Sequence, residues 1–200
     1  MPTYRSKAKD SYNTRMRFLK FHCVVNDIAP TINSFLEFDL SKHEDLVTIY
    51  TCQYYQWDSS DKLEGVKSEL SINEIYKKIK HLNFTKDIES EWFEKYFKIF
   101  KTQYSEDNFK KDTNAQECYY CKITLDEINT LASEQKLFKK NERGFTMEID
   151  RKKPNLEYTN ENCVPACYWC NNAKTDEFDD LEFMPIAEQI KAIFNKRLNS

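Results

Sequence analysis

Glycine is scarce in this sequence. Two of the 200 residues are glycine, so the loops must be shaped by Asn, Asp, Pro and side-chain hydrogen bonds. No run approaches the roughly 20 consecutive apolar residues that a membrane-spanning helix needs. The first 20 residues are polar and lack the apolar core of a signal peptide. We therefore expect a cytoplasmic protein with no membrane partner, in a reducing compartment that disfavours disulfides.

Net positive charge is lacking too. The formal net charge is −3, so the chain as a whole is not a basic nucleic-acid binder. Basic residues nevertheless gather in residues 5–20 and 136–153, and an acidic run follows at 176–182. Basic patches of this kind can hold phosphates, or they can be solvated faces. With 40% hydrophobic and 32% charged residues, the composition is typical of a globular protein of one large or two small domains.

The first region shows no motif that indicates chemistry. Residues 46–57 are rich in β-branched and aromatic side chains and predict a strand, whereas 71–82 and 88–100 have helical spacing. The aromatic residues of 88–100 favour a helix packed on a core; a base-stacking platform or an exposed docking face are the alternatives. The polar stretch 105–116 is interpreted as a linker. We expect residues 1–112 to form a region of unknown role, for which target recognition and partner recognition are the open interpretations, and residues 113–200 to form a second domain.

The second region predicts short elements around a small sheet. Thr124 and Glu127 have the spacing of a capping box and predict a helix from that point. Residues 141–144 predict a turn, 145–149 a short strand and 162–167 its partner, with Pro165 favouring an edge position. Further helices are expected just after Cys170 and over 185–198. The fold class is therefore α+β in a mostly helical chain.

Four of the seven cysteines form two Cys-x-x-Cys pairs, Cys118 with Cys121 and Cys167 with Cys170. Each pair puts two sulfurs on one side of a turn, and two such turns complete a tetrahedral zinc site. Binding a structural zinc contributes roughly 10 kcal/mol or more to folding. The alternatives are a redox pair, which normally occurs once beside a βαβ pattern, or incidental buried thiols. The remaining cysteines are expected to be buried thiols: Cys23, Cys52 and Cys163.

The surroundings of these pairs resemble the HNH endonuclease family. The resemblance rests on Met147-Glu-Ile-Asp-Arg, then Asn162-Cys-Val-Pro-Ala-Cys-Tyr-Trp-Cys-Asn-Asn-Ala-Lys174, in combination with the first cysteine pair. It covers about residues 118–178. It implies a ββα-metal (HNH) module stapled by the zinc ion, with metal-dependent hydrolysis of phosphodiester bonds in DNA. Family members are restriction enzymes, homing or phage nucleases, and effectors in phage defence.

The resemblance also implies a second metal. In the family, one divalent cation is held by residues that correspond here to Asp150 and Asn171, and their oxygen ligands suit Mg²⁺ or Mn²⁺. Such a cation neutralises the phosphate and stabilises the leaving oxygen. Asn162 matches a residue that braces the loop between the strands, and Lys174 matches a lysine that contacts phosphate.

Arg151 occupies the position of the family's histidine base, and no histidine follows residue 81. Arginine cannot act as a base at neutral pH, but it can clamp the scissile phosphate. Water activation would then fall to the metal, to Tyr158, or to a histidine from the first region. Tyr158 can instead be a packing aromatic of the loop. Lys152 and Lys153 complete the expected contacts with nucleic acid.

Two further functions stay open. Arg151 is compatible with a catalytically inactive, zinc-bearing module that binds nucleic acid or docks a protein. The first region is compatible with a partner-binding surface, and a homodimer would explain any double-strand cleavage, since one site cuts one strand. Asp150 and Asn171 argue for catalysis, because a purely structural zinc domain has no evident use for them.

Overall fold

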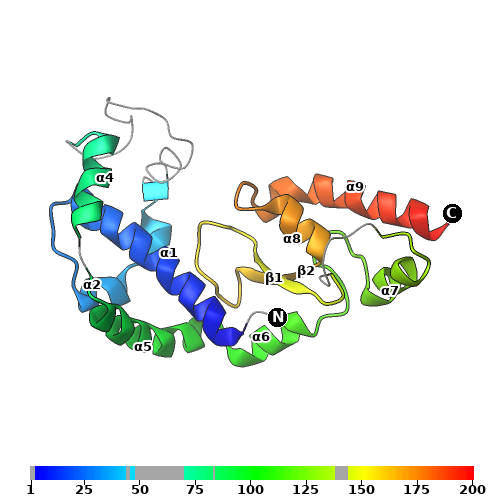
Figure 1. The fold of residues 1–200 in the computed structure, drawn as a ribbon, viewed down its shortest axis with the longest axis horizontal. Helices are drawn as coiled ribbons and strands as arrows, with labels where there is room; N and C mark the ends of the chain where they lie inside the picture. Colours follow the sequence, from blue (N-terminus) through cyan, green and yellow to red (C-terminus); the bar gives the residue numbers. More distant parts are fainter. Residues whose placement is uncertain (1–2, 44–45, 48–69, 83, 138–143) are drawn as a thin grey trace. The chain divides into compact units, whose positions relative to one another are not determined.

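The computed structural model describes residues 3–43, 46–47, 70–82, 84–137 and 144–200 (Figure 1). These residues are mostly helical and include a two-stranded antiparallel sheet, which agrees with the expected α+β class. The chain divides into two compact units, residues 1–100 (unit 1) and 101–200 (unit 2). Within the described ranges, every helix is too short or too polar to cross a membrane.

The described part of unit 1 consists of helices around an aromatic core. In order along the chain, its described elements are α1 (Tyr4–Val25), α2 (Ile32–Glu37), the short 3-10 helix η1 (Leu40–Lys42), α4 (Ile72–His81) and most of α5 (Lys86–Gln103). The ring of Tyr12 on α1 lies 5.1 Å from that of Phe35 on α2 and 5.5 Å from that of Phe93 on α5, edge to face in both cases. Each edge-to-face pair of this kind contributes about 0.5–1.5 kcal/mol beyond the stabilisation that comes from its buried area.

The two helices expected in this unit are confirmed as α4 and α5. A capping box begins α4 at Ser71. Trp92, Phe93, Tyr96 and Phe100 of α5 are buried, so this helix packs on a core and does not present an open aromatic platform. The strand expected at 46–57 lies outside the described residues, apart from two residues at its start that are helical.

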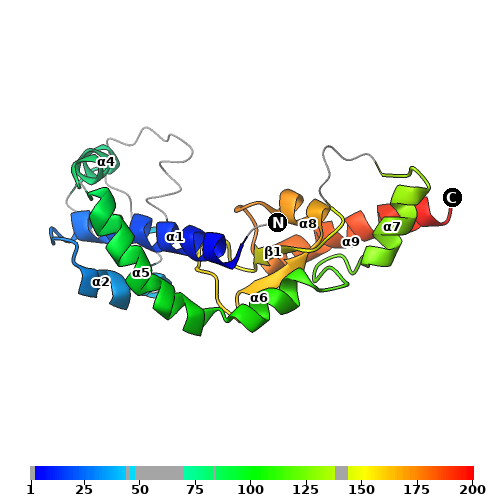
Figure 2. The ribbon, with the colours of Figure 1, turned by 60° about the horizontal axis from the view of Figure 1, so that its bottom comes forward.

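Unit 2 surrounds the sheet with short helices. Its elements are α6 (Glu106–Thr113), α7 (Leu125–Ser133), β1 (Glu148–Arg151), β2 (Cys163–Ala166), α8 (Tyr168–Lys174) and α9 (Asp180–Leu198). The strands are antiparallel, with Asp150 opposite Val164. Helix α8 packs against β1, and α9 packs against both α7 and α8 (Figures 1 and 2). Beside the four paired cysteines, the core contains Tyr120, Ile123, Ile128, Leu131, Met147, Val164, Ala166, Phe183, Ala187 and Phe194.

The prediction of a linker at 105–116 is wrong, because most of this stretch forms helix α6. Ser105 caps α6 by accepting from the backbone N–H of Asn108, and the helix packs against both strands. The buried Tyr104 donates a hydrogen bond of 2.8 Å from its hydroxyl to Asp112, which anchors this polar-looking segment to the core. Unit 2 accordingly begins at Lys101.

Caps explain where the other elements begin. The capping box of Thr124 and Glu127 is confirmed at the start of α7. The first strand begins at Glu148, three residues later than expected. The partner strand lies where it was expected and contains Pro165, which a two-stranded sheet tolerates because each strand is an edge. Of the turn expected at 141–144, residues 141–143 lie outside the described residues.

Helices α8 and α9 both begin earlier than expected. The thiol of Cys167 caps α8, so the helix begins at Tyr168 and not after Cys170. A capping box formed by Asp179 and Glu182 begins α9, which leaves Pro185 inside the helix. The proline there removes one backbone hydrogen bond, so the cap offsets part of its cost.

Candidate metal centre and the polar face beside it

Four thiols meet in the core of unit 2. The Sγ atoms of Cys118, Cys121, Cys167 and Cys170 lie within 4.8 Å of one another, and all four residues are buried. The sulfurs of Cys121 and Cys167 are 3.7 Å apart. A tetrahedral ion with Zn–S distances near 2.3 Å places its sulfur ligands about 3.8 Å from each other. The donor set and its spacing therefore fit zinc, and the cluster can hold such an ion.

The two cysteine turns are built differently. In the first, the N–H of Lys122 donates to the carbonyl of Cys118 (3.1 Å), and the N–H of Cys118 donates to that of Ile123 (3.0 Å). Lys122 takes a left-handed φ of 60°, a conformation that glycine adopts at lower cost. In the second, the backbone N–H of Cys170 donates to the sulfur of its capping partner, Cys167 (3.4 Å). An ion bound here would join the first turn to the end of β2 and to α8.

The thiols influence one another strongly. Hydrogen bonds from the other three cysteines hold the pKa of Cys118 well below its usual range. The same interactions raise the pKa values of Cys167 and Cys170. A bound zinc ion would deprotonate its coordinating thiols outright. Of the other cysteines, Cys23 and Cys163 are buried thiols as expected, and burial raises the pKa of Cys23 to about 11, whereas residue 52 lies outside the described ranges.

A polar face lies next to this cluster, where β1 meets α8. Glu148 and Asp150 are two residues apart in β1, so their side chains point to the same side of the sheet. Asn171 and Lys174 are three residues apart on one side of α8. The amide Nδ2 of Asn171 donates to Glu148 Oε2 over 2.6 Å, and Lys174 Nζ lies 3.2 Å from Asp150 Oδ2. The strand and the helix therefore bring Asp150 and Asn171 to facing surfaces.

Asp150 is held by two partners on the protein. Besides Lys174, it accepts a 2.6 Å hydrogen bond from the hydroxyl of Tyr120, which belongs to the first cysteine turn. Burial and the nearby carboxylate raise the pKa of Tyr120. Lys174 is 0% exposed and also donates to the carbonyl of Arg151 over 2.8 Å. The resemblance implies a phosphate as its partner, whereas here the ammonium pairs with Asp150 and donates a hydrogen bond to the backbone.

Arg151 ends β1 and holds the following loop. Its guanidinium donates to the carbonyl of Leu156 (3.1 Å) and pairs with Asp176 (3.3 Å). It also lies 5.0 Å from the ring centroid of Tyr158. Tyr158 is buried and packs on Tyr104 with ring centroids 6.5 Å apart. These surroundings are those of a packing aromatic, which was the alternative to a role as base.

The loop between the strands is fastened by Asn162. Its side chain accepts from the backbone N–H of Lys153 (2.9 Å) and donates to the carbonyls of Lys153 (3.1 Å) and Glu157 (2.9 Å). The backbone N–H of Lys152 donates to the carbonyl of Asn162 over 2.7 Å. The loop is thus closed at its base, and Lys153 projects an exposed side chain from it.

Two residues of this face were missed from the sequence. Glu148 could have been found from strand alternation, because it lies two residues before Asp150 and shares its side of β1. Tyr120 lies between the first two cysteines, where the metal motif draws attention to the thiols alone, and nothing in the sequence indicates its bond to Asp150. All three histidines, which include the possible external base, belong to unit 1.

Comparisons with known proteins give little. No protein-family model matches the chain, and a search of curated proteins finds no significant match. Among solved structures, the chain is similar to the rare-cutting HNH restriction endonuclease PacI, with 20% sequence identity over 70% of this chain and 90% of that chain. The TM-score of that comparison is 0.35.

Proposed function

We propose that this protein is a metal-dependent endonuclease of the HNH type that hydrolyses phosphodiester bonds in DNA. One observation carries the proposal: beside the four-thiol cluster, side chains of α8 contact side chains of β1, with Asn171 bonded to Glu148 and Lys174 paired with Asp150. In this proposal residues 113–200 contain the ββα-metal module, the cluster holds structural zinc, and the polar face holds Mg²⁺ or Mn²⁺. Restriction or phage defence are the roles we infer from the resemblance.

The hydrogen bond of Asn171 supports such a role. Because its Nδ2 donates to Glu148, its amide plane is fixed and the remaining oxygen, Oδ1, is the atom that can bind a cation. Asp150 uses Oδ2 for Tyr120 and Lys174, which leaves Oδ1 as the corresponding atom on the strand. A divalent cation bound there would neutralise the phosphate and stabilise the leaving oxygen.

Arg151 is suited to holding the scissile phosphate. Its present carboxylate partner, Asp176, has a side chain that is 81% exposed, and ion pairs this open contribute about 1 kcal/mol or less. A phosphate can therefore replace that carboxylate at the same guanidinium and gain charge-assisted hydrogen bonds. Exposed Lys153 lies close by in the sequence, and we assign it and Lys152 to flanking phosphates.

A second candidate function rests on the ion pair of Asp150. The ammonium of Lys174 already balances this carboxylate, and Arg151 stands where the family has its base. Both features suit a catalytically inactive zinc-bearing module that binds nucleic acid or docks a protein.

Plasmid cleavage separates the two functions. Purified protein would be incubated with supercoiled plasmid and Mg²⁺ or Mn²⁺, beside the Asp150→Ala and Asn171→Ala variants. The matched control is Asn172→Ala, on the next residue of α8, which is exposed and donates to the carbonyl of Tyr168. We expect nicking by the parent and the control and a loss of at least about 100-fold in both site variants. Cleavage that persists in both would remove the site, and DNA binding without cleavage under either metal would favour the inactive module.

A further inference from the structure

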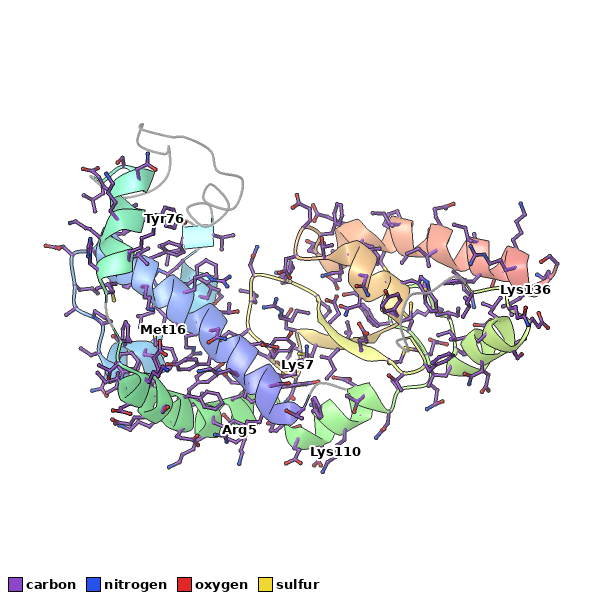
Figure 3. The ribbon with its side chains drawn as sticks, viewed as in Figure 1. Arg5, Lys7, Met16, Tyr76, Lys110 and Lys136 are labelled. Carbon is purple, nitrogen blue, oxygen red and sulfur yellow. The ribbon has the colours of Figure 1, made fainter. Side chains whose placement is uncertain are left out.

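A basic groove crosses the surface of unit 1, whereas the residues assigned above belong to unit 2. It has a volume of about 410 Å³ and lies between α1, α4 and the start of α5. Figure 3 labels two of its lining residues, Met16 on α1 and Tyr76 on α4. Its charged lining residues are Lys9, Arg17, Lys20, Lys80 and Glu89. Four cations and one carboxylate thus line this groove in a chain whose formal net charge is −3.

The cations on α1 form a stripe along the groove. Lys9, Arg17 and Lys20 recur at spacings of eight and three residues, which keeps them on one side of a helix. At a rise of 1.5 Å per residue, the stripe is about 16 Å long. One strand of duplex DNA presents about five phosphates over that length, at roughly 3.4 Å each.

Aromatic rings support two of these ammonium groups. Lys9 Nζ lies 4.3 Å from the ring centroid of Tyr12, and Lys20 Nζ lies 4.8 Å from that of Phe84. Within the part of the chain that the structure describes, neither lysine has a carboxylate in ion-pair distance, nor does Lys80. A ring face positions an ammonium without neutralising its charge, so these groups keep their attraction for anions.

We infer that this groove binds the phosphate backbone of nucleic acid, as a second contact surface distinct from the polar face of unit 2. The inference rests on the proposed function for its choice of nucleic acid as the anion. A concave, cation-lined groove fits a strand of phosphates better than it fits the flat surface of an anionic membrane. Two of its aromatic lining residues, Tyr12 and Phe21, are each 2% exposed, so they cannot stack on bases. Because the cations would contact phosphates, we expect binding to be independent of sequence and sensitive to salt.

The test measures binding, not cleavage. The full chain would be titrated into a fluorescein-labelled 30-base-pair duplex without added divalent cation, at several salt concentrations, with fluorescence anisotropy as the readout. The groove variant is Lys20→Gln/Lys80→Gln. The control, Lys77→Gln/Lys98→Gln, removes the same charge from exposed lysines on α4 and α5 that do not line the groove. Circular dichroism would establish that both variants fold.

The groove variant is expected to lower the slope of log K against log salt by about 1.8, or 0.9 per lost contact. Its Kd at low salt is expected to rise at least about ten-fold, equally for duplexes of different sequence, while the control stays within two-fold of the parent. A slope that is unchanged, or that falls equally in the control, overturns the inference. Loss of binding to phosphatidylserine vesicles with unchanged duplex binding overturns it in favour of a lipid surface.

A plasmid-cleavage assay on the same protein distinguishes failure of the groove inference from failure of the proposed nuclease function. An unchanged slope in a protein that still nicks plasmid refutes the groove alone. A normal loss of slope in a protein that never nicks plasmid refutes the nuclease assignment and leaves the groove as a nucleic-acid contact.

Discussion

Methionine in place of Lys174 is expected to destabilise unit 2, because it removes the ammonium and leaves the charge of Asp150 behind. The side chain of Lys174 is fully buried, that of Asp150 is 12% exposed, and Nζ and Oδ2 are 3.2 Å apart. Breaking a buried ion pair by removing one partner costs about 3–5 kcal/mol. Because water reaches part of Asp150, we expect about 3 kcal/mol of the free energy of unfolding to be lost. Methionine retains most of the buried volume, so little of this loss would come from a cavity.

Urea denaturation followed by circular dichroism measures this loss, and hydrogen exchange in peptides covering β1 and α8 localises it. A double-mutant cycle with Asp150→Asn isolates the interaction, for which we expect a coupling of about 2 kcal/mol. The control is Lys95→Met, which breaks the exposed pair with Glu91 and is expected to cost less than about 1 kcal/mol. Additive effects of Lys174→Met and Asp150→Asn, within about 0.5 kcal/mol, would refute the reasoning.

Three other variants probe the same unit. Tyr120→Phe removes the hydroxyl that donates a hydrogen bond to Asp150, and we expect urea denaturation to show a free energy of unfolding lower by about 1.5–2 kcal/mol. An unchanged free energy of unfolding would mean that this hydrogen bond does not stabilise the carboxylate. Asn162→Ala removes three hydrogen bonds to the loop and is expected to cost about 2–4 kcal/mol and to raise hydrogen exchange over residues 152–162; unchanged exchange there would contradict the bracing role. Lys191→Met tests pH dependence: burial raises the pKa of Glu127, but hydrogen bonds from Lys191 and Thr124 outweigh it, so the pKa is lowered on folding. The pair therefore contributes its stability, about 1 kcal/mol, above the unfolded pKa of Glu127, and the difference between parent and variant is lost as the pH falls through the lowered pKa of the folded state. A difference that does not decrease as Glu127 is protonated would contradict it.

The parts of the fold that follow from local chemistry could be predicted from the sequence. Cysteine spacing predicts a four-thiol cluster, because the tetrahedral preference of zinc constrains which side chains must meet. The cap of α7 could be predicted for a similar reason, since a capping box involves residues three apart. Where such a cap was overlooked, as at Asp179, the start of the helix was placed five residues late, at Pro185.

Partners far apart in the chain could not be predicted. The resemblance identifies Lys174 as a lysine of interest, but its burial against Asp150 depends on how α8 packs on β1. Helix α6 was missed because its sequence is mostly polar, and its attachment depends on Tyr104, which lies before the segment. The composition of a segment does not determine its burial, because burial depends on which distant segments pack against it.

A zinc ion at the four-thiol cluster is central to the proposed function, because it would join the first cysteine turn, which contains Tyr120, to α8, which carries Asn171 and Lys174. X-ray absorption at the zinc edge of the purified chain, with metal content measured on the same sample, tests this most directly. We predict one zinc per chain, bound by four sulfurs at about 2.3 Å. A protein without zinc, or a zinc ion bound mainly by nitrogen or oxygen, would contradict the account.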